Sequence, residues 1–481
     1  MRQQRDTRGR RRRRFAPTLA LIVALFSMGG GAATLAGLPF ADGSPRPENP
    51  DPFFARAGNS GYEADAYRTE LDVRPAKQRL RGRLTMTATA TADLSRFFID
   101  SRPNLKIGST TVDGAQSEAE QRGDQDLRIT PADGIAEGEQ FELVLEFAGK
   151  PGRRAGSGWI KTADGSIALN EPRGVPSWLP VNDDVRDKAL WDFELTVPAE
   201  LEAVANGTFE GREAGGGRAT YTWHGEEPMS SYLAVVAIGD FEIERREIAG
   251  IPAWIAVDRE LVNSSDPRQE PEGLRALPRI HRLFAARFGR YPFSSTGAII
   301  DRVPVPYALE TQTRSSFDGQ PGDALMAHEV AHQWFGDSVG LERWPDIWLN
   351  EGFATWAQWL WVQHEGRERL GERLRRMCRI PASDDSMWRP PPAYPGNASR
   401  LFKLSIYNRG GLALEALRQR IGGETFNELM RRWATQNRYG SVRILEFQAL
   451  AEQVSGQQLD RLFDDWLRDP RKPAGCERYQ R

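Results

Sequence analysis

The sequence predicts a multidomain α+β protein in which a β-rich N-terminal half precedes a helix-rich half. Three observations predict this arrangement. The chain has 481 residues, which is more than one ordinary domain contains. Up to about residue 245, apolar residues recur at every second position, the period of a half-buried strand. From Leu274 onward they recur at helical spacing instead.

Residues 59–247 are expected to form an N-terminal β domain. The segments 84–90, 141–147 and 191–197 alternate apolar with polar residues, as strands with one buried face do. Turn dipeptides such as Asn206-Gly207 separate these runs. Sheets with one apolar face must bury it against another layer. We therefore expect a mostly antiparallel β-saddle or sandwich.

Residues 248–481 are expected to form the second domain, which ends in a short helical region. Apolar residues at helical spacing predict a helix over 274–288, and Gly289 ends it. Two further helices are expected to pass through His328 and Glu351. After a proline-rich break, the expected helices span 412–421, 425–434, 444–454 and 459–467.

Residues 1–41 have the features of a leader for export. Arg10 to Arg14 form a basic start, and the 27 residues from 15 to 41 carry no charge. They fit a cleaved signal peptide, or an uncleaved membrane anchor, since an uncharged run of this length can span a bilayer. The protein is therefore expected to be secreted or held at the cell surface. Residues 42–58, rich in Pro, Gly and Asp, are typical of a linker.

Charge and cysteine content limit the classes of partner and the redox setting. Residues 1–41 hold eight of the 64 basic residues and one of the 66 acidic ones, so the rest of the chain carries a net charge of −9. An acidic protein is a poor nucleic-acid binder, and no such partner is expected. The two cysteines, Cys378 and Cys476, could pair in an exported protein or could be two unrelated thiols.

A His-Glu-x-x-His motif at residues 328–332 is the strongest chemical signal. His328 and His332 are four residues apart, so both lie on one face of a helix and can bind one zinc ion. Glu329 can take a proton from the water that such a zinc activates, without being a ligand itself. Glu351, with eighteen residues between it and His332, is the candidate third ligand. The motif predicts one catalytic zinc per chain, with one coordination position open.

The motif has two other possible interpretations. The two histidines could be ordinary half-buried helix residues, although five His in 481 residues rarely fall four apart with Glu after the first. A closed structural zinc site would need a fourth protein ligand. No third His or any Cys lies nearby to supply it.

The motif and its surroundings resemble the zinc site of the aminopeptidase N family of zinc metallopeptidases, a gluzincin group that also contains leukotriene hydrolase. The resemblance rests on the segments 328–336 (HEVAHQWFG) and 348–354 (WLNEGFA) and extends over most of the chain after Tyr67. It implies a thermolysin-like zinc catalytic domain behind an N-terminal β-saddle. It also implies that His328, His332 and Glu351 bind zinc and that Glu329 is the general base.

The resemblance implies roles for three more residues. Tyr407, in a Tyr-x-x-Gly motif with Gly410, would stabilise the oxyanion of the reaction. Glu310 and Glu171 would bind the substrate's α-ammonium group. The chain departs from the family pattern around Glu310, where Gly, Met and Asn are replaced, and before Glu171, where a Gln is absent. It also ends about 130 residues after Glu351, without the long helical domain of larger members.

The expected activity is that of a zinc aminopeptidase acting on peptide substrates. A zinc endopeptidase with a more open cleft is the first alternative, because the amine-binding motif is altered. A peptide-binding scaffold with an idle metal site is the second, and a leukotriene-type epoxide hydrolase is a more remote one. Attachment to a membrane through residues 15–41 is a further expectation, and the oligomeric state stays open.

Overall fold

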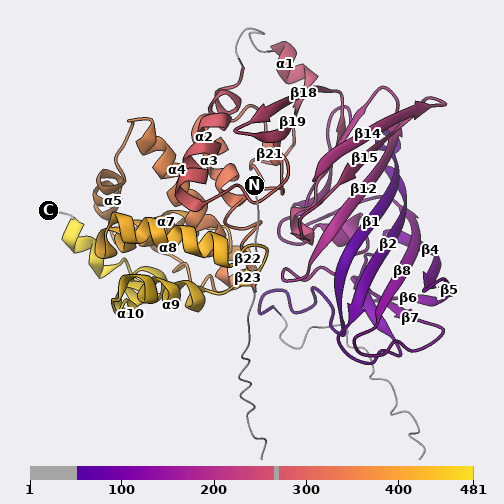
Figure 1. Cartoon of the computed structure of the whole chain (residues 1–481), viewed down its shortest axis with the longest axis horizontal. Coiled ribbons are helices and arrows are strands. Elements are labelled where there is room, and N and C mark those ends of the chain that lie inside the picture. The colour runs from indigo at the N-terminus through magenta and orange to yellow at the C-terminus, as the bar shows by residue number, and fades with distance from the viewer. Residues whose placement is uncertain (1–50, 265–269, 480–481) are drawn as a thin grey trace, which may run out of the picture. The chain divides into compact units, whose positions relative to one another are not determined.

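The computed structural model describes residues 51–264 and 270–479 (Figure 1). The predicted leader, residues 1–41, and the start of the predicted linker lie outside these ranges. None of the helices in these ranges combines the length and the apolar composition of a membrane-spanning segment. Residues 51–58, in the predicted linker, pack against the folded chain. The Asp51 carboxylate accepts a hydrogen bond from the backbone of Trp344, and the ring of Phe54 lies 5.9 Å from that of Trp344.

The N-terminal domain is built on a nine-stranded sheet. Strands alternate buried and exposed residues, as in β2, so each sheet has one apolar face. All its pairs are antiparallel except β1 with β12. The order is β14 (Thr208–Gly215), β15 (Arg218–His224), β12 (Lys188–Pro198), β1 (Tyr62–Arg74), β2 (Arg79–Ala90), β8 (Gln140–Gly149), β4 (Leu105–Val112) and β5 (Ala115–Gln116), and β16 (Met229–Ser230) pairs with β12.

Two smaller sheets complete this domain. The five-stranded sheet has the order β13 (Glu202–Ala205), β17 (Val236–Gly239), β11 (Ser166–Leu169), β10 (Ser157–Lys161) and β9 (Arg153–Arg154). The three-stranded sheet has the order β3 (Phe97–Asp100), β7 (Asp126–Thr130) and β6 (Glu118–Arg122). The saddle or sandwich of sheets expected from the alternating pattern is confirmed.

The second domain begins with a four-stranded sheet that the sequence did not predict. Its order is β18 (Phe241–Ile248), β19 (Ile251–Asp258), β20 (Thr296–Asp301) and β21 (Ser315–Asp318). The first pair is antiparallel and the next two are parallel. The expected boundary between residues 247 and 248 falls inside β18. β18 pairs with β19 and not with the sheets before it, so it belongs to the second domain. A short pair, β22 (Gly340–Leu341) and β23 (Ser441–Val442), lies further along the chain.

Helices make up the rest of the second domain, as expected from their spacing. They are α1 (Arg259–Ser264), α2 (Glu272–Phe288), α3 (Asp323–His332), α4 (Trp348–His364), α5 (Leu370–Cys378), α6 (Asp385–Trp388), α7 (Leu404–Ile421), α8 (Gly423–Gln436), α9 (Ile444–Ser455) and α10 (Asp460–Phe463), followed by a π-helical turn (Asp464–Arg468). A disulfide joins Cys378, at the end of α5, to Cys476.

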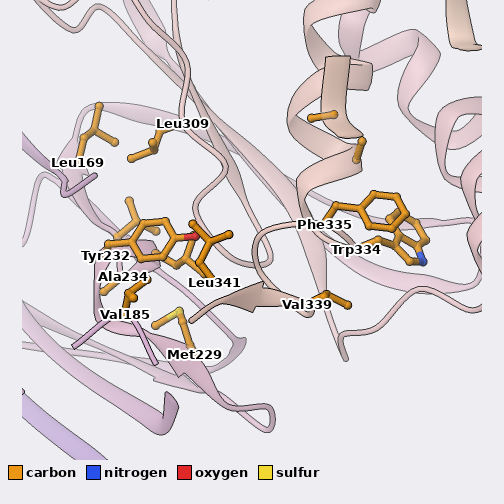
Figure 2. Packing of buried hydrophobic residues seen from close by; sticks show 14 of the residues in the cluster. Leu169, Val185, Met229, Tyr232, Ala234, Leu309, Trp334, Phe335, Val339 and Leu341 are labelled. Carbon is orange, nitrogen blue, oxygen red and sulfur yellow. The ribbon is translucent and has the colours of Figure 1, made fainter. Parts of the chain in front are cut away.

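One hydrophobic cluster runs through both domains. Figure 2 shows part of it, with Leu169, Met229 and Tyr232 of the β domain and Leu309 and Leu341 of the second domain among the labelled residues. Burial of such apolar surface holds the domains together.

A buried lysine adds a polar contact to the same domain junction. The ammonium group of Lys188, in β12, donates hydrogen bonds to the carbonyl oxygens of Asp337, Ser338 and Gly440 at 2.8, 3.0 and 3.1 Å. Three acceptors match the three donors of an ammonium group. Gly340 leaves room for the lysine, because a Cβ atom at residue 340 would lie 2.8 Å from its side chain.

Candidate active site

Helices α3 and α4 bring the three candidate zinc ligands together. The Nε2 atoms of His328 and His332 lie 3.3 and 3.5 Å from Oε2 of Glu351. Ligands that are about 2.0–2.1 Å from a tetrahedral zinc ion lie about 3.3–3.4 Å from one another. The three side chains therefore fit a zinc ion. As expected, α3 ends and α4 begins between His332 and Glu351.

The orientation of His332 is fixed by the turn that follows α3. Its Nδ1 atom lies 3.1 Å from the carbonyl oxygen of Phe335. A hydrogen bond to this carbonyl places the proton on Nδ1 and leaves Nε2 free to bind a metal. The chain can turn back at this point because Gly336 has a φ of 133°.

Four carboxylates crowd around the two imidazoles. Donor atoms of Glu310, Glu329 and His332 lie within 4.8 Å of one another, and so do those of Glu171, Glu310 and Glu351. Burial alone would raise the pKa of Glu351, but the imidazoles, that of His332 first, lower it to about 2. Four carboxyl groups and two imidazoles, all able to bind a cation, thus share one small site.

The other carboxyl groups have raised pKa values. Burial raises the pKa of Glu329 well above its usual range, although His332 opposes the rise and Glu310 adds to it. Burial, then Glu310 and Glu351, raise the pKa of Glu171. Burial also raises the pKa of Glu310, against the effect of His332. Raised carboxyl pKa values are typical of sites that bind a cation or transfer protons.

Tyr407, on α7, lies beside the candidate zinc ligand His328. Its ring centroid is 6.0 Å from that of His328, and the two rings are inclined by 23°. Burial raises the pKa of Tyr407 well above its usual value, and Glu351 adds to the rise. The hydroxyl group is therefore protonated at neutral pH and can donate a hydrogen bond.

Two glycines explain how closely α7 approaches α4. Gly352 follows the candidate ligand Glu351, and a Cβ atom at residue 352 would lie 3.1 Å from the backbone of Gly410. A Cβ atom at Gly410 would lie 3.1 Å from the Cα of Gly352. The glycine of the Tyr-x-x-Gly motif is thus the contact point that sets Tyr407 near the ligands.

Glu310 is held by Gln333, a residue that the sequence analysis missed. The side-chain amide of Gln333 donates to the carbonyl oxygen of Glu310 at 3.3 Å, and its oxygen accepts from the backbone of Thr313 at 2.8 Å. Leu309 also forms a bridge with Ser316 of β21. Gln333 directly follows the zinc motif, but its partners become visible only in the folded chain.

The β domain also contacts the loop that carries Glu310, residues 309–314. The guanidinium of Arg314 donates to the carbonyl oxygens of Ala205 and Gly207 at 2.6 and 2.5 Å and lies 4.5 Å above the ring of Trp223. Asn206 donates to the carbonyl oxygen of Gln312 at 2.8 Å. The turn dipeptide Asn206-Gly207 is therefore also a support for the Glu310 loop.

Glu171 is contributed to the site by the β domain. It follows β11 and is half-buried. Its neighbour Asn170 accepts a hydrogen bond from the indole of Trp178 at 2.8 Å and donates to the carbonyl oxygen of Ala234 at 2.6 Å. The side chains of all seven predicted site residues therefore meet in one place, although they come from both domains.

Comparison with known protein families finds a match for each of the two domains. Residues 63–233 match the model of the peptidase M1 N-terminal domain, and residues 277–466 match that of the peptidase family M1 domain. The chain belongs to the M1 family of zinc metallopeptidases. The expected family and fold class are thereby confirmed, and enzymes of this family are hydrolases.

Solved structures of the M1 family resemble this chain over nearly their whole length. One is a mutant M1 zinc metallopeptidase from Deinococcus radiodurans, crystallised with a Tyr-Ser-Ala substrate. It is 27% identical, with a TM-score of 0.79 over 88% of this chain and 99% of that chain.

Curated M1 relatives are longer proteins. Tricorn protease-interacting factor F2 of Thermoplasma acidophilum is 25% identical over 65% of this chain and 42% of its own length. Glutamyl aminopeptidase of Sus scrofa is 26% identical over 68% of this chain and 38% of its own length. The match thus spans about two fifths of these relatives.

Proposed function

We propose that this M1 protein is a zinc aminopeptidase that hydrolyses the first peptide bond of peptides. The observation that carries the proposal is the position of Glu171 and Glu310. Their carboxylates have donor atoms within 4.8 Å of Glu351, a candidate zinc ligand. One oxygen of each is buried without a hydrogen-bond partner among the described residues. An ammonium group bound there would lie next to the metal.

His328, His332 and Glu351 would hold one zinc ion. When bound, zinc supplies a Lewis acid that polarises the peptide carbonyl and lowers the pKa of water. Glu329 takes a proton from the attacking water and passes it to the leaving amine as the C–N bond breaks. Tyr407 donates a hydrogen bond to the carbonyl oxygen as it gains negative charge. Glu171 and Glu310 hold the α-ammonium group, which places the first peptide bond at the reacting centre.

A panel of aminoacyl fluorogenic substrates and matched peptides with free or acetylated N-termini tests this proposal. The free peptides should be cleaved and the acetylated ones spared, and a zinc chelator should abolish cleavage. Equal cleavage of both would favour the endopeptidase alternative, because it would mean that the enzyme does not recognise the free α-ammonium group of the substrate. No cleavage of any substrate by zinc-loaded protein would favour the scaffold alternative.

Two variants separate binding from chemistry. Glu310→Gln keeps the shape of the side chain and removes its charge, so it should raise KM for free peptides by about 10-fold or more. Glu329→Gln should retain one equivalent of zinc and lose activity by about 10²–10⁴-fold. Full activity of the Glu329→Gln protein would contradict the mechanism.

We also propose that the protein is exported, either secreted or attached to a membrane through residues 15–41. The disulfide between Cys378 and Cys476 supports this, since disulfides persist in oxidising compartments. Fractionation of cells, with and without reductant in the gel, tests it. Fully reduced protein in the cytosolic fraction would contradict export.

A further inference from the structure

Three aspartates outside the active site meet where the β domain joins the four-stranded sheet. Asp164 lies in the turn between β10 and β11, Asp258 ends β19 and Asp301 ends β20. One carboxylate oxygen from each lies within 4.8 Å of the others. The parallel pairing of β19 with β20 brings Asp258 and Asp301 together. Val257 pairs with Ile300, so the next residue of each strand lies beside the other.

Asp301 is buried without a basic partner. It is 1% exposed, neither of its carboxylate oxygens accepts a well-formed hydrogen bond among the described residues, and Asp258 could pair with it only by sharing a proton. The arginines that follow Asp258 and Asp301 in the sequence pair elsewhere, Arg259 with Asp240 and Arg302 with Glu260. Burial of an unpaired carboxylate is costly unless the group binds a proton or a cation.

The other two carboxylates are held in place by the backbone around them. Oδ1 of Asp258 accepts a hydrogen bond from the backbone of Glu260 at 2.6 Å. Oδ1 of Asp164 lies 3.2 Å from the hydroxyl of Thr162, and its Oδ2 accepts from the backbone of Asp240. Fixed ligands lose little freedom on binding, which favours affinity.

We propose that Asp164, Asp258 and Asp301 bind a hard divalent cation, calcium or magnesium, that fastens the β10–β11 turn to the ends of β19 and β20. All three ligands are carboxylates, which suit these ions better than zinc. Calcium ligands at about 2.4 Å lie up to about 4.8 Å apart across the ion, so donor atoms within 4.8 Å of one another can share one ion. Asp164 is exposed, so water can enter and complete the coordination.

Calorimetric titration of the zinc-loaded full chain, freed of calcium and magnesium, tests the proposal. Calcium chloride and magnesium chloride are added separately, and one ion per chain should bind in addition to zinc. At about 100 times the dissociation constant, the cation should raise the thermal unfolding midpoint by about 2–4 °C. The salt that binds more tightly identifies the ion. No binding of either would overturn the proposal.

Three variants assign the binding to this cluster. Asp301→Asn and Asp164→Asn should lose the cation-induced shift of the unfolding midpoint. Because Asp164 is exposed, its substitution leaves the packing of the core unchanged. Asp133→Asn, which removes one exposed charge elsewhere in the β domain, should keep the shift. A shift retained in both cluster variants would place the ion elsewhere and overturn the proposal.

Discussion

At the scale of single residues, the hydroxyl of Tyr407 can be tested apart from its ring. Tyr407→Phe keeps the stacking on His328 and removes only the donor to the oxyanion. We expect kcat to fall by about 10²–10³-fold, with KM and zinc content little changed, because the interaction forms in the transition state. Tyr394→Phe, at a tyrosine that is 59% exposed, is the matched control. A Tyr407→Phe enzyme with unaltered kcat would remove this residue from the mechanism.

The titration of the Asp301 carboxyl group should make the stability of the protein fall as the pH rises. Burial, then Asp164 and Asp258, raise its pKa from 3.8 to about 7 in the folded protein. Between about pH 4 and 7 the folded state binds more protons than the unfolded one, so stability falls as pH rises and levels off above 7. In buffer without calcium or magnesium, Asp301→Asn should remove this fall and be more stable than the parent at pH 8, by about 2–4 kcal/mol.

Urea unfolding of both proteins from pH 4.5 to 8 measures this difference. A parent protein whose stability relative to Asp301→Asn does not change over that range would contradict the expected titration. Addition of the bound cation should flatten the curve of the parent, because the ion competes with the proton.

Local spacing made some site residues predictable and hid others. His328, Glu329 and His332 are set by one helix, so their spacing alone predicted a metal site. Gln333 and Arg314 could not be assigned, because their partners lie in segments that only folding brings near. The aspartate cluster was missed for the same reason. Its members are more than 40 residues apart and end strands or lie in a turn.

At the scale of elements, the crossing of α4 and α7 depends on two glycines. Gly410→Ala would place a Cβ atom 3.1 Å from the backbone of Gly352 and push the helices apart. We expect a loss of about 1–3 kcal/mol of stability and a lower kcat, since Tyr407 moves with α7. Gly371→Ala, in α5, meets only the ends of two side chains, at 3.5 and 3.8 Å, and should leave kcat unchanged. Wild-type kcat in Gly410→Ala would show that the crossing tolerates displacement.

Strands with one exposed face were predictable and fully buried strands were not. β2, β8 and β12 alternate apolar with polar residues, and the sequence predicted all three. β20 is buried along its whole length, on both faces, so it lacks the period-two signal. Helix α5 was also missed, although its amphipathic pattern of buried Leu370 and Leu374 beside exposed arginines fits a helix.

At the scale of the whole molecule, the disulfide closes a long loop around the C-terminal helices. Cys378 and Cys476 are 98 residues apart in sequence. The double variant Cys378→Ala/Cys476→Ala should lose about 2–5 kcal/mol of stability. Without the cross-link the unfolded chain gains conformational entropy, and this gain is larger for a longer loop. Activity at 25 °C should persist, since Cys378 ends α5 and Cys476 lies in the turn 474–479, and neither segment contains any of the seven site residues. Urea unfolding measures this loss. The expectation would be contradicted if the double variant unfolded at the same urea concentration as the parent and if reductant did not change the midpoint of the parent.

The assembly of one site from both domains has a consequence for when the enzyme becomes active during its synthesis. Glu171 and Tyr407 are separated by 235 intervening residues. A growing chain therefore carries Glu171 of the β domain long before the tyrosine of α7 has been made. Under the proposed mechanism hydrolysis needs both residues, so the appearance of activity in refolding or translation experiments should report the docking of the second domain, the final step of assembly.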